Sequence, residues 1–351
     1  MESYKYKSLS YTNNHYGFYL MFGLITYFIW CDLNFFGELS AEQELGFNLA
    51  NITQNFPSIS IKLRMQDHFA HYVYLPFCQW VEDTFKISKV PGITPNVITA
   101  VHFTLAFCAA RVLAYPEVFF SKLAAIIFEV RTMLDTMDGV VYRAQSSLNT
   151  YVSGWGSYGF IIDGIADTVG GIFLTIALIY KFNKNPPFQN FDDISLMRKK
   201  HNFDQESSKS LLTSDESISK ENEDLYGLVR YSKKTVNFTI IFFTILVIIR
   251  SSLWDYFNHN YHNLFALRRQ DIPLEKQWEV LGYKSTWFSL WLWKTTSADA
   301  FMHFTLISIL FNKLWEWLRF NMYASIIHII CVSMICQVHL MHVRYVLGVS
   351  S

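Results

Sequence analysis

Four aspartates lie in two pairs near the middle of this sequence, each pair at a spacing close to one helical turn. Asp135 and Asp138 are three residues apart, and Asp163 and Asp167 are four residues apart. On helices, the members of each pair therefore share one face. The flanking residues are apolar over lengths that could cross a bilayer, where each ionised side chain costs at least about 2.5 kcal/mol. A divalent cation such as Mg²⁺ or Mn²⁺ is the partner that suits converging carboxylates.

Two residues beside the first pair suit a phosphate ligand. Gly139 would let a ligand approach the backbone closely, because glycine has no side chain. Arg143, one turn further on, supplies a permanent positive charge whose geometry matches phosphate. A metal, a phosphate-binding arginine and a spare carboxylate together indicate phosphoryl transfer at a membrane surface.

The spacing of these residues resembles the signature of the CDP-alcohol phosphatidyltransferase family, D-x2-D-G-x2-A-R-x8-G-x3-D-x3-D. The chain matches the signature at Asp135, Asp138, Gly139, Arg143, Gly159, Asp163 and Asp167. It departs from it twice: Tyr142 stands where the family has alanine, and fifteen residues separate Arg143 from Gly159 where the family has eight. Both departures resemble the variant found in the ceramide phosphoethanolamine synthases, invertebrate enzymes that join phosphoethanolamine to ceramide.

The resemblance implies a role for each matching residue. It implies metal binding by all four aspartates, Asp135, Asp138, Asp163 and Asp167. Asp167 is in addition the implied catalytic base toward the acceptor hydroxyl. Binding of the CDP portion of the donor is implied for Gly139, Arg143, Asp135 and Gly159. The implied cofactor is Mn²⁺, with Mg²⁺ as the alternative, and the implied assembly is a homodimer.

The implied reaction transfers phosphoethanolamine from CDP-ethanolamine to the primary hydroxyl of ceramide and releases CMP. Ceramide and diacylglycerol both offer a primary hydroxyl on a two-tailed lipid, so an ethanolamine or choline phosphotransferase acting on diacylglycerol is an alternative. A cation transporter lined by the carboxylates is an alternative of another class. It gives no reason for Gly139 and Arg143 at their offsets, and an arginine in a cation path would be counterproductive.

Composition indicates a membrane protein. The chain has 351 residues, 51% of them hydrophobic, with 31 Phe, 20 Tyr and 10 Trp, and a formal net charge of zero. So many aromatic residues are typical of proteins that place them at membrane interfaces. A neutral chain has no global positive field for binding nucleic acid. Four of the five cysteines lie in apolar runs and only Cys78 is expected to be exposed, which argues against a disulfide scaffold.

The pattern of apolar runs predicts an all-α integral membrane protein with interfacial helices and about seven transmembrane helices, and the resemblance implies a CDP-alcohol phosphatidyltransferase core. The expected spans are 16–36, 97–113, 119–142, 159–180, 236–253, 298–314 and 323–338. The expected organisation is a cytosolic tail (1–15), a signal-anchor helix (16–36), a lumenal and interfacial segment (37–95), the catalytic core helices (96–182), a partly disordered cytosolic loop (183–233) and the remaining membrane helices (234–351), which include a lumenal aromatic segment (254–295).

Positive charges beside the spans predict the orientation. The loop 183–233 is bordered by Lys181, Lys184, Arg230, Lys233 and Lys234, whereas 144–158 contains no Lys or Arg. Because such residues mark the cytosolic side, the four aspartates are expected to face the lumen. Asn51, in the sequon Asn51-Ile52-Thr53, falls on the same side and is a candidate glycosylation site. The resemblance implies a Golgi membrane.

Other polar residues are interpreted structurally. Arg131 lies four residues before Asp135 and is expected to form a salt bridge with it. Asp299 and His303 share a helical face and could reach the site, although a pair with each other is the favoured interpretation. Helix packing is expected for His102, His328, His339 and His342, and an interfacial anchor for Trp287, Trp291 and Trp293. The sequence has no spacing typical of a zinc site.

Overall fold

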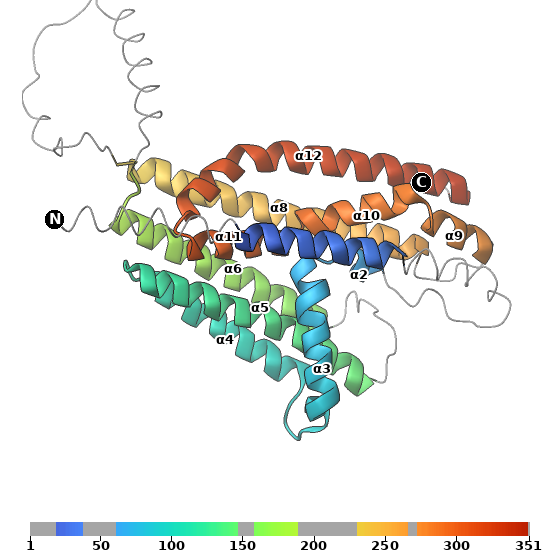
Figure 1. Cartoon of the computed structure of the whole chain (residues 1–351), viewed down its shortest axis with the longest axis horizontal. Coiled ribbons are helices and arrows are strands. Elements are labelled where there is room, and N and C mark those ends of the chain that lie inside the picture. Colours follow the sequence, from blue (N-terminus) through green and yellow to red (C-terminus); the bar gives the residue numbers. More distant parts are fainter. Residues whose placement is uncertain (1–18, 38–60, 147–157, 189–229, 266–271, 350–351) are drawn as a thin grey trace, which may run out of the picture.

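Figure 1 shows the computed structural model of the chain. It describes residues 19–37, 61–146, 158–188, 230–265 and 272–349. Within those ranges the chain forms helices and no strands, with one isolated antiparallel bridge between Phe188 and Arg230. The predicted all-α fold is confirmed. The predictions for Asn51, for the tail 1–15 and for the centre of the loop 183–233 lie outside the described residues.

Five helices of the described part of the chain are long and apolar enough to cross a membrane. They are the N-terminal helix (Tyr19–Gly37), α4 (Pro95–Leu113), α6 (Tyr158–Lys184), α8 (Lys233–Phe265) and α12 (Leu314–Leu347). A sixth helix, α5 (Val118–Ser146), has 29 residues, which is long enough to span, but it carries charged residues along its length. These six helices coincide with six of the expected spans.

The remaining expected span, 298–314, does not cross the bundle as one helix. It forms one half of a pair of short consecutive helices. α10 (Lys284–Thr296) and α11 (Ala298–Leu310) have 13 residues each. Each is therefore only about 20 Å long, less than the hydrocarbon core of about 30 Å. α10 packs in a core cluster with the C-terminal ends of α8 and α12, whereas α11 packs in a second cluster with their N-terminal ends. The pair thus runs from one end of the bundle to the other, interrupted at Ser297.

The N-terminal helix is tied to α10 by Asp32. The Asp32 carboxylate accepts hydrogen bonds from Tyr72 at 2.5 Å and from Trp291 Nε1 at 2.7 Å. Trp293 is buried to 2% exposure between α8 and α12. The interpretation of the α10 tryptophans as an interfacial anchor is therefore wrong for Trp293, which packs in the core of the bundle.

Helices α4, α5 and α6 approach closely because small residues line their contacts. Ala106 and Ala109 on α4 and Ala125 on α5 are almost fully buried. A Cβ atom added at Gly170 of α6 would lie 3.3 Å from the Cβ of Ala106, which is closer than ordinary contact. Small residues at such positions let membrane helices pack backbone against backbone. The side chains that follow on the same faces are thereby brought together.

Hydrogen bonds fix the N-terminal end of α4 and the C-terminal end of α5. The Thr94 side chain caps α4 by accepting a hydrogen bond from the Val97 amide, and Pro95 follows at the first helical position. Near the C-terminal end of α5, the side-chain amide nitrogen of Gln145 donates hydrogen bonds to the backbone carbonyls of Ser88 and Ile93 at 3.1 and 3.0 Å. The short helix α3 (Leu75–Phe85) crosses the long helices at a steep angle (Figure 1), as expected for an interfacial helix.

All five cysteines are free, which confirms that the chain has no disulfide scaffold. The expectation about exposure was wrong, however. Cys78 is buried at 2% exposure, whereas Cys108 and Cys331 are exposed on the outside of the bundle. Cys78 lies on the face of α3 that packs against Met137 and Val141 of α5, which removes it from solvent.

We predict that Gly170→Val destabilises the protein by about 1–3 kcal/mol, because the added side chain overpacks the contact with Ala106. Gly171→Val is the matched control, since a Cβ at Gly171 meets nothing within 4 Å and the β-branched side chain has the same helix propensity. Thermal unfolding of both variants in detergent tests this. Equal unfolding temperatures for the two variants would contradict the close contact of α4 with α6.

Candidate metal centre

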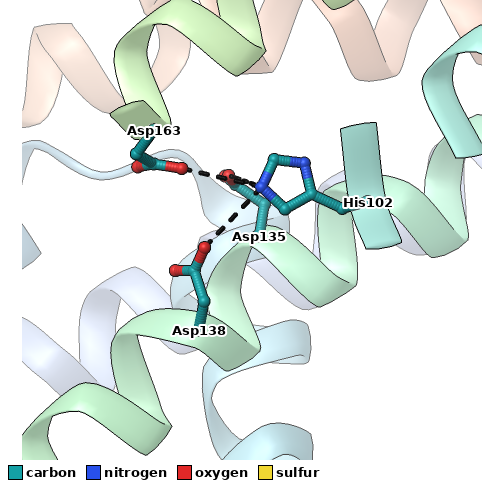
Figure 2. A group of neighbouring side chains, drawn as sticks. All are labelled: His102, Asp135, Asp138 and Asp163. Carbon is teal, nitrogen blue, oxygen red and sulfur yellow. Dashed lines mark ion pairs between the residues drawn. The ribbon is translucent and has the colours of Figure 1, made fainter. Parts of the chain in front are cut away.

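Four side chains from three helices point toward one centre in Figure 2. His102 comes from α4, Asp135 and Asp138 from α5, and Asp163 from α6. The Nε2 atom of His102 lies 3.6 Å from one oxygen of each of the three aspartates. One nitrogen or oxygen atom from each residue lies within 4.8 Å of the others. The three aspartates predicted as metal ligands are therefore brought together.

The polar atoms of this centre lack hydrogen-bond partners. Oδ1 of Asp135, Oδ1 of Asp163 and both ring nitrogens of His102 are buried with no partner. Only Asp138 is supported, because its Oδ2 accepts a hydrogen bond from the Thr99 hydroxyl at 2.8 Å. Buried unsatisfied oxygens and converging like charges are both costly. A divalent cation would satisfy these atoms together, so the residues present fit such an ion.

His102 was not recognised as part of this centre from the sequence. Its interpretation as a satisfied packing residue is wrong, since its ring is fully buried and its Nε2 atom faces three carboxylates. His102 follows Thr99 by one helical turn, so both lie on the face of α4 that meets α5. The sequence pattern places both residues on one face but does not show which helix that face contacts.

Asp167 is not one of the four residues whose ligand atoms converge, but it lies beside them and interacts electrostatically with Asp135, Asp163 and His102. Its Oδ1 atom accepts a hydrogen bond from the Arg131 guanidinium, and its side chain is 44% exposed. The expected partner of Arg131 was Asp135, which is wrong: Arg131 reaches across from α5 to α6. Because an arginine holds one oxygen of Asp167, that carboxylate is oriented by the protein itself and is partly open to a substrate.

Gly139 and Arg143 occupy one face of α5, as predicted. A Cβ atom at Gly139 would lie 3.4 Å from Nη1 of Arg143, so the guanidinium passes directly over the glycine. Gly159 lies in the first turn of α6, the helix that follows α5 in the sequence. Whether these residues bind a nucleotide is not tested by the geometry, and this role stays a prediction.

His303 does not form the expected pair with Asp299. Its Nδ1 atom lies 3.1 and 3.2 Å from the two oxygens of Glu129, and its Nε2 atom lies 3.5 Å from Oδ1 of Asp67. By contrast, the packing interpretation is confirmed for His339, whose ring bonds to the hydroxyls of Tyr261 and Thr286 at 2.8 and 3.2 Å. The sequence thus missed a second polar cluster, centred on His303.

Comparison with known proteins gives two consistent findings. Residues 48–348 match the family model described as ceramide phosphoethanolamine synthase. The chain is also 25% identical over 289 residues to the ceramide phosphoethanolamine synthase of Drosophila melanogaster, an alignment that covers 82% of this chain and 69% of that protein. The family match runs over α4, α5 and α6.

We predict that Mn²⁺ raises the unfolding temperature of the wild-type protein and not that of Asp163→Asn. Binding at 100 times Kd would stabilise the fold by about 2.7 kcal/mol. In the absence of metal, Asp163→Asn should be at least as stable as the wild type, because one of three like charges is removed. Thermal unfolding with and without Mn²⁺ measures both effects.

Asp83→Asn is the control, because Asp83 lies outside the centre and its side chain is 62% exposed. It should keep the full response to Mn²⁺. An Asp163→Asn protein with the wild-type response would show that these carboxylates are not the metal ligands.

Proposed function

Since the chain belongs to the ceramide phosphoethanolamine synthase family, we propose that it transfers phosphoethanolamine from CDP-ethanolamine to the primary hydroxyl of ceramide. The family makes the chain a phosphotransferase and sets aside the cation transporter. The observation that carries the proposed mechanism is the convergence of Asp135, Asp138, Asp163 and His102 on one centre.

The proposed reaction is a single displacement at phosphorus. The ceramide hydroxyl oxygen forms a bond to the phosphorus that carries ethanolamine, while the bond from that phosphorus to the bridging oxygen breaks. CMP leaves with the bonding electrons, and the hydroxyl proton passes to a base. Arg143, lying over Gly139, would hold the negatively charged CDP portion.

The metal would be held by Asp135, Asp138 and Asp163 together with His102. A divalent cation bound there supplies charge neutralisation for the phosphates of the donor. Mg²⁺ prefers oxygen ligands only, whereas Mn²⁺ also accepts an imidazole nitrogen. The position of His102 among the three carboxylates therefore supports Mn²⁺ as the cofactor.

Asp167 is the proposed base. Its bond to Arg131 fixes the carboxylate at the edge of the metal centre, and its partly exposed side chain can meet an acceptor hydroxyl. Asp167 was also predicted as a metal ligand, but it does not belong to the four residues whose ligand atoms converge. The arrangement favours the role of base over that of ligand.

We predict that purified protein with Mn²⁺ releases CMP from CDP-ethanolamine only when an acceptor lipid is present, and that Asp167→Asn lowers turnover by about 100-fold or more. The affinity for CDP-ethanolamine should stay near that of the wild type, because the lost group acts on the acceptor. Steady-state kinetics and equilibrium donor binding separate the two quantities.

Two outcomes would contradict this assignment. A loss confined to donor affinity would make Asp167 a ligand and not the base. A wild-type protein that binds CDP-ethanolamine but transfers nothing to ceramide or diacylglycerol would refute the proposed reaction itself.

We propose further that the metal centre faces the lumen of the Golgi. The end of the bundle remote from the centre gathers basic residues: Arg111, Lys122, Lys181, Lys184, Arg230, Lys233, Lys234 and Lys313. Lys181 also bonds to the Tyr115 carbonyl at 2.9 Å, which joins the ends of α4 and α6 there. Basic residues beside membrane helices favour the cytosolic side. The proposed homodimer rests on the resemblance alone, and sizing in detergent would check it.

We predict that, in sealed vesicles of a cysteine-free background, a cysteine at Ser214 reacts with an impermeant thiol reagent from outside. A cysteine at Ser147 should react only after permeabilisation. The reason is that 183–233 adjoins the basic end of the bundle, whereas 144–158 adjoins the metal centre. The reverse labelling pattern would put the centre in the cytosol.

A further inference from the structure

A second cluster of charged residues lies beside the metal centre. Its members are Asp67, in the bend between α2 (Ile61–Met65) and the π-helical turn Ala70–Tyr74; Glu129 on α5; and Asp299 and His303 on α11. His303 links two of the carboxylates, because its ring contacts both Glu129 and Asp67. The Tyr74 hydroxyl also donates a hydrogen bond to Glu129.

This cluster is continuous with the proposed base. Asp299 interacts electrostatically with Asp67 and His303 on one side, and with Asp167 and Arg131 on the other. Arg131 is two residues from Glu129 on α5 and forms the ion pair with Asp167. A molecule whose reacting oxygen lies at Asp167 would therefore have its neighbouring atoms beside Asp299.

Exposure decreases from Asp167 and Asp299 into the cluster. Asp299 is exposed and the Glu129 side chain is 26% exposed, whereas Asp67 and His303 are buried at 2% and 0%. A carboxylate at membrane depth does not face acyl chains without a large cost, so the uncovered side of Asp299 faces water or a polar group. The cluster thus runs from exposed or partly exposed carboxylates to fully buried polar groups.

The buried part of the cluster has unused hydrogen-bonding capacity. Oδ2 of Asp67 and Nε2 of His303 are buried with no hydrogen-bond partner. Oδ1 of Asp67 already accepts a hydrogen bond from the Ala70 amide at 3.0 Å, so the unsatisfied oxygen is the other one. A buried acceptor without a partner, here Oδ2 of Asp67, points to a ligand that donates a hydrogen bond.

We propose that Asp67, Glu129, Asp299 and His303 bind the polar part of the acceptor lipid and select ceramide over diacylglycerol. This inference rests on the proposed function. Ceramide has an amide N–H and a secondary hydroxyl that donate hydrogen bonds, whereas the ester groups of diacylglycerol only accept them. Ionised carboxylates also only accept. Ceramide therefore satisfies the cluster, and the esters of diacylglycerol would face it oxygen to oxygen.

The expected preference for ceramide over diacylglycerol can be compared with that of other buried polar binding sites. A site built to bond a substrate hydroxyl or N–H rejects an analogue that lacks it much more strongly than a site that recognises shape. Loss of one hydrogen bond to a charged group corresponds to a change of roughly 10- to 100-fold in kcat/KM. The same change should appear when a single donor of ceramide is removed.

The test compares kcat/KM for ceramide, for 3-deoxyceramide, which lacks the secondary hydroxyl, and for diacylglycerol, with CDP-ethanolamine and Mn²⁺ throughout. Wild-type protein should prefer ceramide to the other two. Asp299→Asn should reduce the ratio of ceramide to diacylglycerol by about 10- to 100-fold, because the amide can donate to an ester carbonyl. The affinity for CDP-ethanolamine and the stabilisation by Mn²⁺ should not change.

Glu129→Gln is the second variant and should shift the ratio in the same direction. It also loses bonds to His303 and Tyr74, so its folding is checked by thermal unfolding. Asp299 accepts no hydrogen bond from the described residues, and Asp299→Asn keeps the inference testable if Glu129→Gln does not fold. Glu117→Gln, an exposed carboxylate at the far end of α5, is the control.

The outcomes separate this inference from the proposed function. Transfer to neither lipid by the wild type would refute the proposed function. Transfer to ceramide and diacylglycerol with equal kcat/KM, or an unchanged ratio in folded Asp299→Asn, would refute the selection by this cluster while leaving the proposed function in place.

Discussion

The mutual repulsion of three carboxylates inside a membrane-embedded bundle is the constraint on which this structure depends. Asp135, Asp138 and Asp163 are held with His102 so that their ligand atoms lie within 4.8 Å of one another. Bringing such charges together inside a membrane costs free energy, because apolar surroundings screen them weakly. The helices must therefore be held together by packing strong enough to resist the repulsion until a cation neutralises it. The alanine and glycine contacts of α4, α5 and α6 supply that packing.

The same constraint explains why the surrounding polar groups are arranged in pairs. Thr99 supports Asp138, Arg131 supports Asp167, and His303 stands between Glu129 and Asp67. Each contact joins different segments of the chain, so each also fixes the position of one helix against another. Removing one partner would leave a buried charge uncompensated, which costs more than the contact itself contributes. The same polar contacts therefore orient the charged side chains and hold the helices of this core in place.

The sequence predicted what depends on spacing along one helix. The aspartate pairs, the position of Arg143 over Gly139 and six long helices all follow from periodicity and length. What depends on contacts between helices was missed or wrong. His102 was assigned to packing and Arg131 to Asp135, because periodicity does not identify the neighbouring helix. The helix boundary at Ser297 agrees with the predicted start of a span at 298, but the pairing of α10 with α11 in one crossing was missed and becomes evident only where the two helices enter different core clusters.

The order of groups along α5 has a geometric meaning for the proposed reaction. In a displacement at phosphorus, the attacking oxygen and the leaving group lie on opposite sides. Arg143, assigned to CMP, and Glu129, assigned to the acceptor lipid, are separated by 14 positions, or about 21 Å along the helix. Asp135 and Asp138 lie between them, and so does Arg131, which holds Asp167. A water-soluble donor would approach the C-terminal end of α5, while a lipid acceptor would enter deeper in the bundle. The helix α5 thus positions the donor, the metal ligands and the acceptor in the order that an in-line displacement requires.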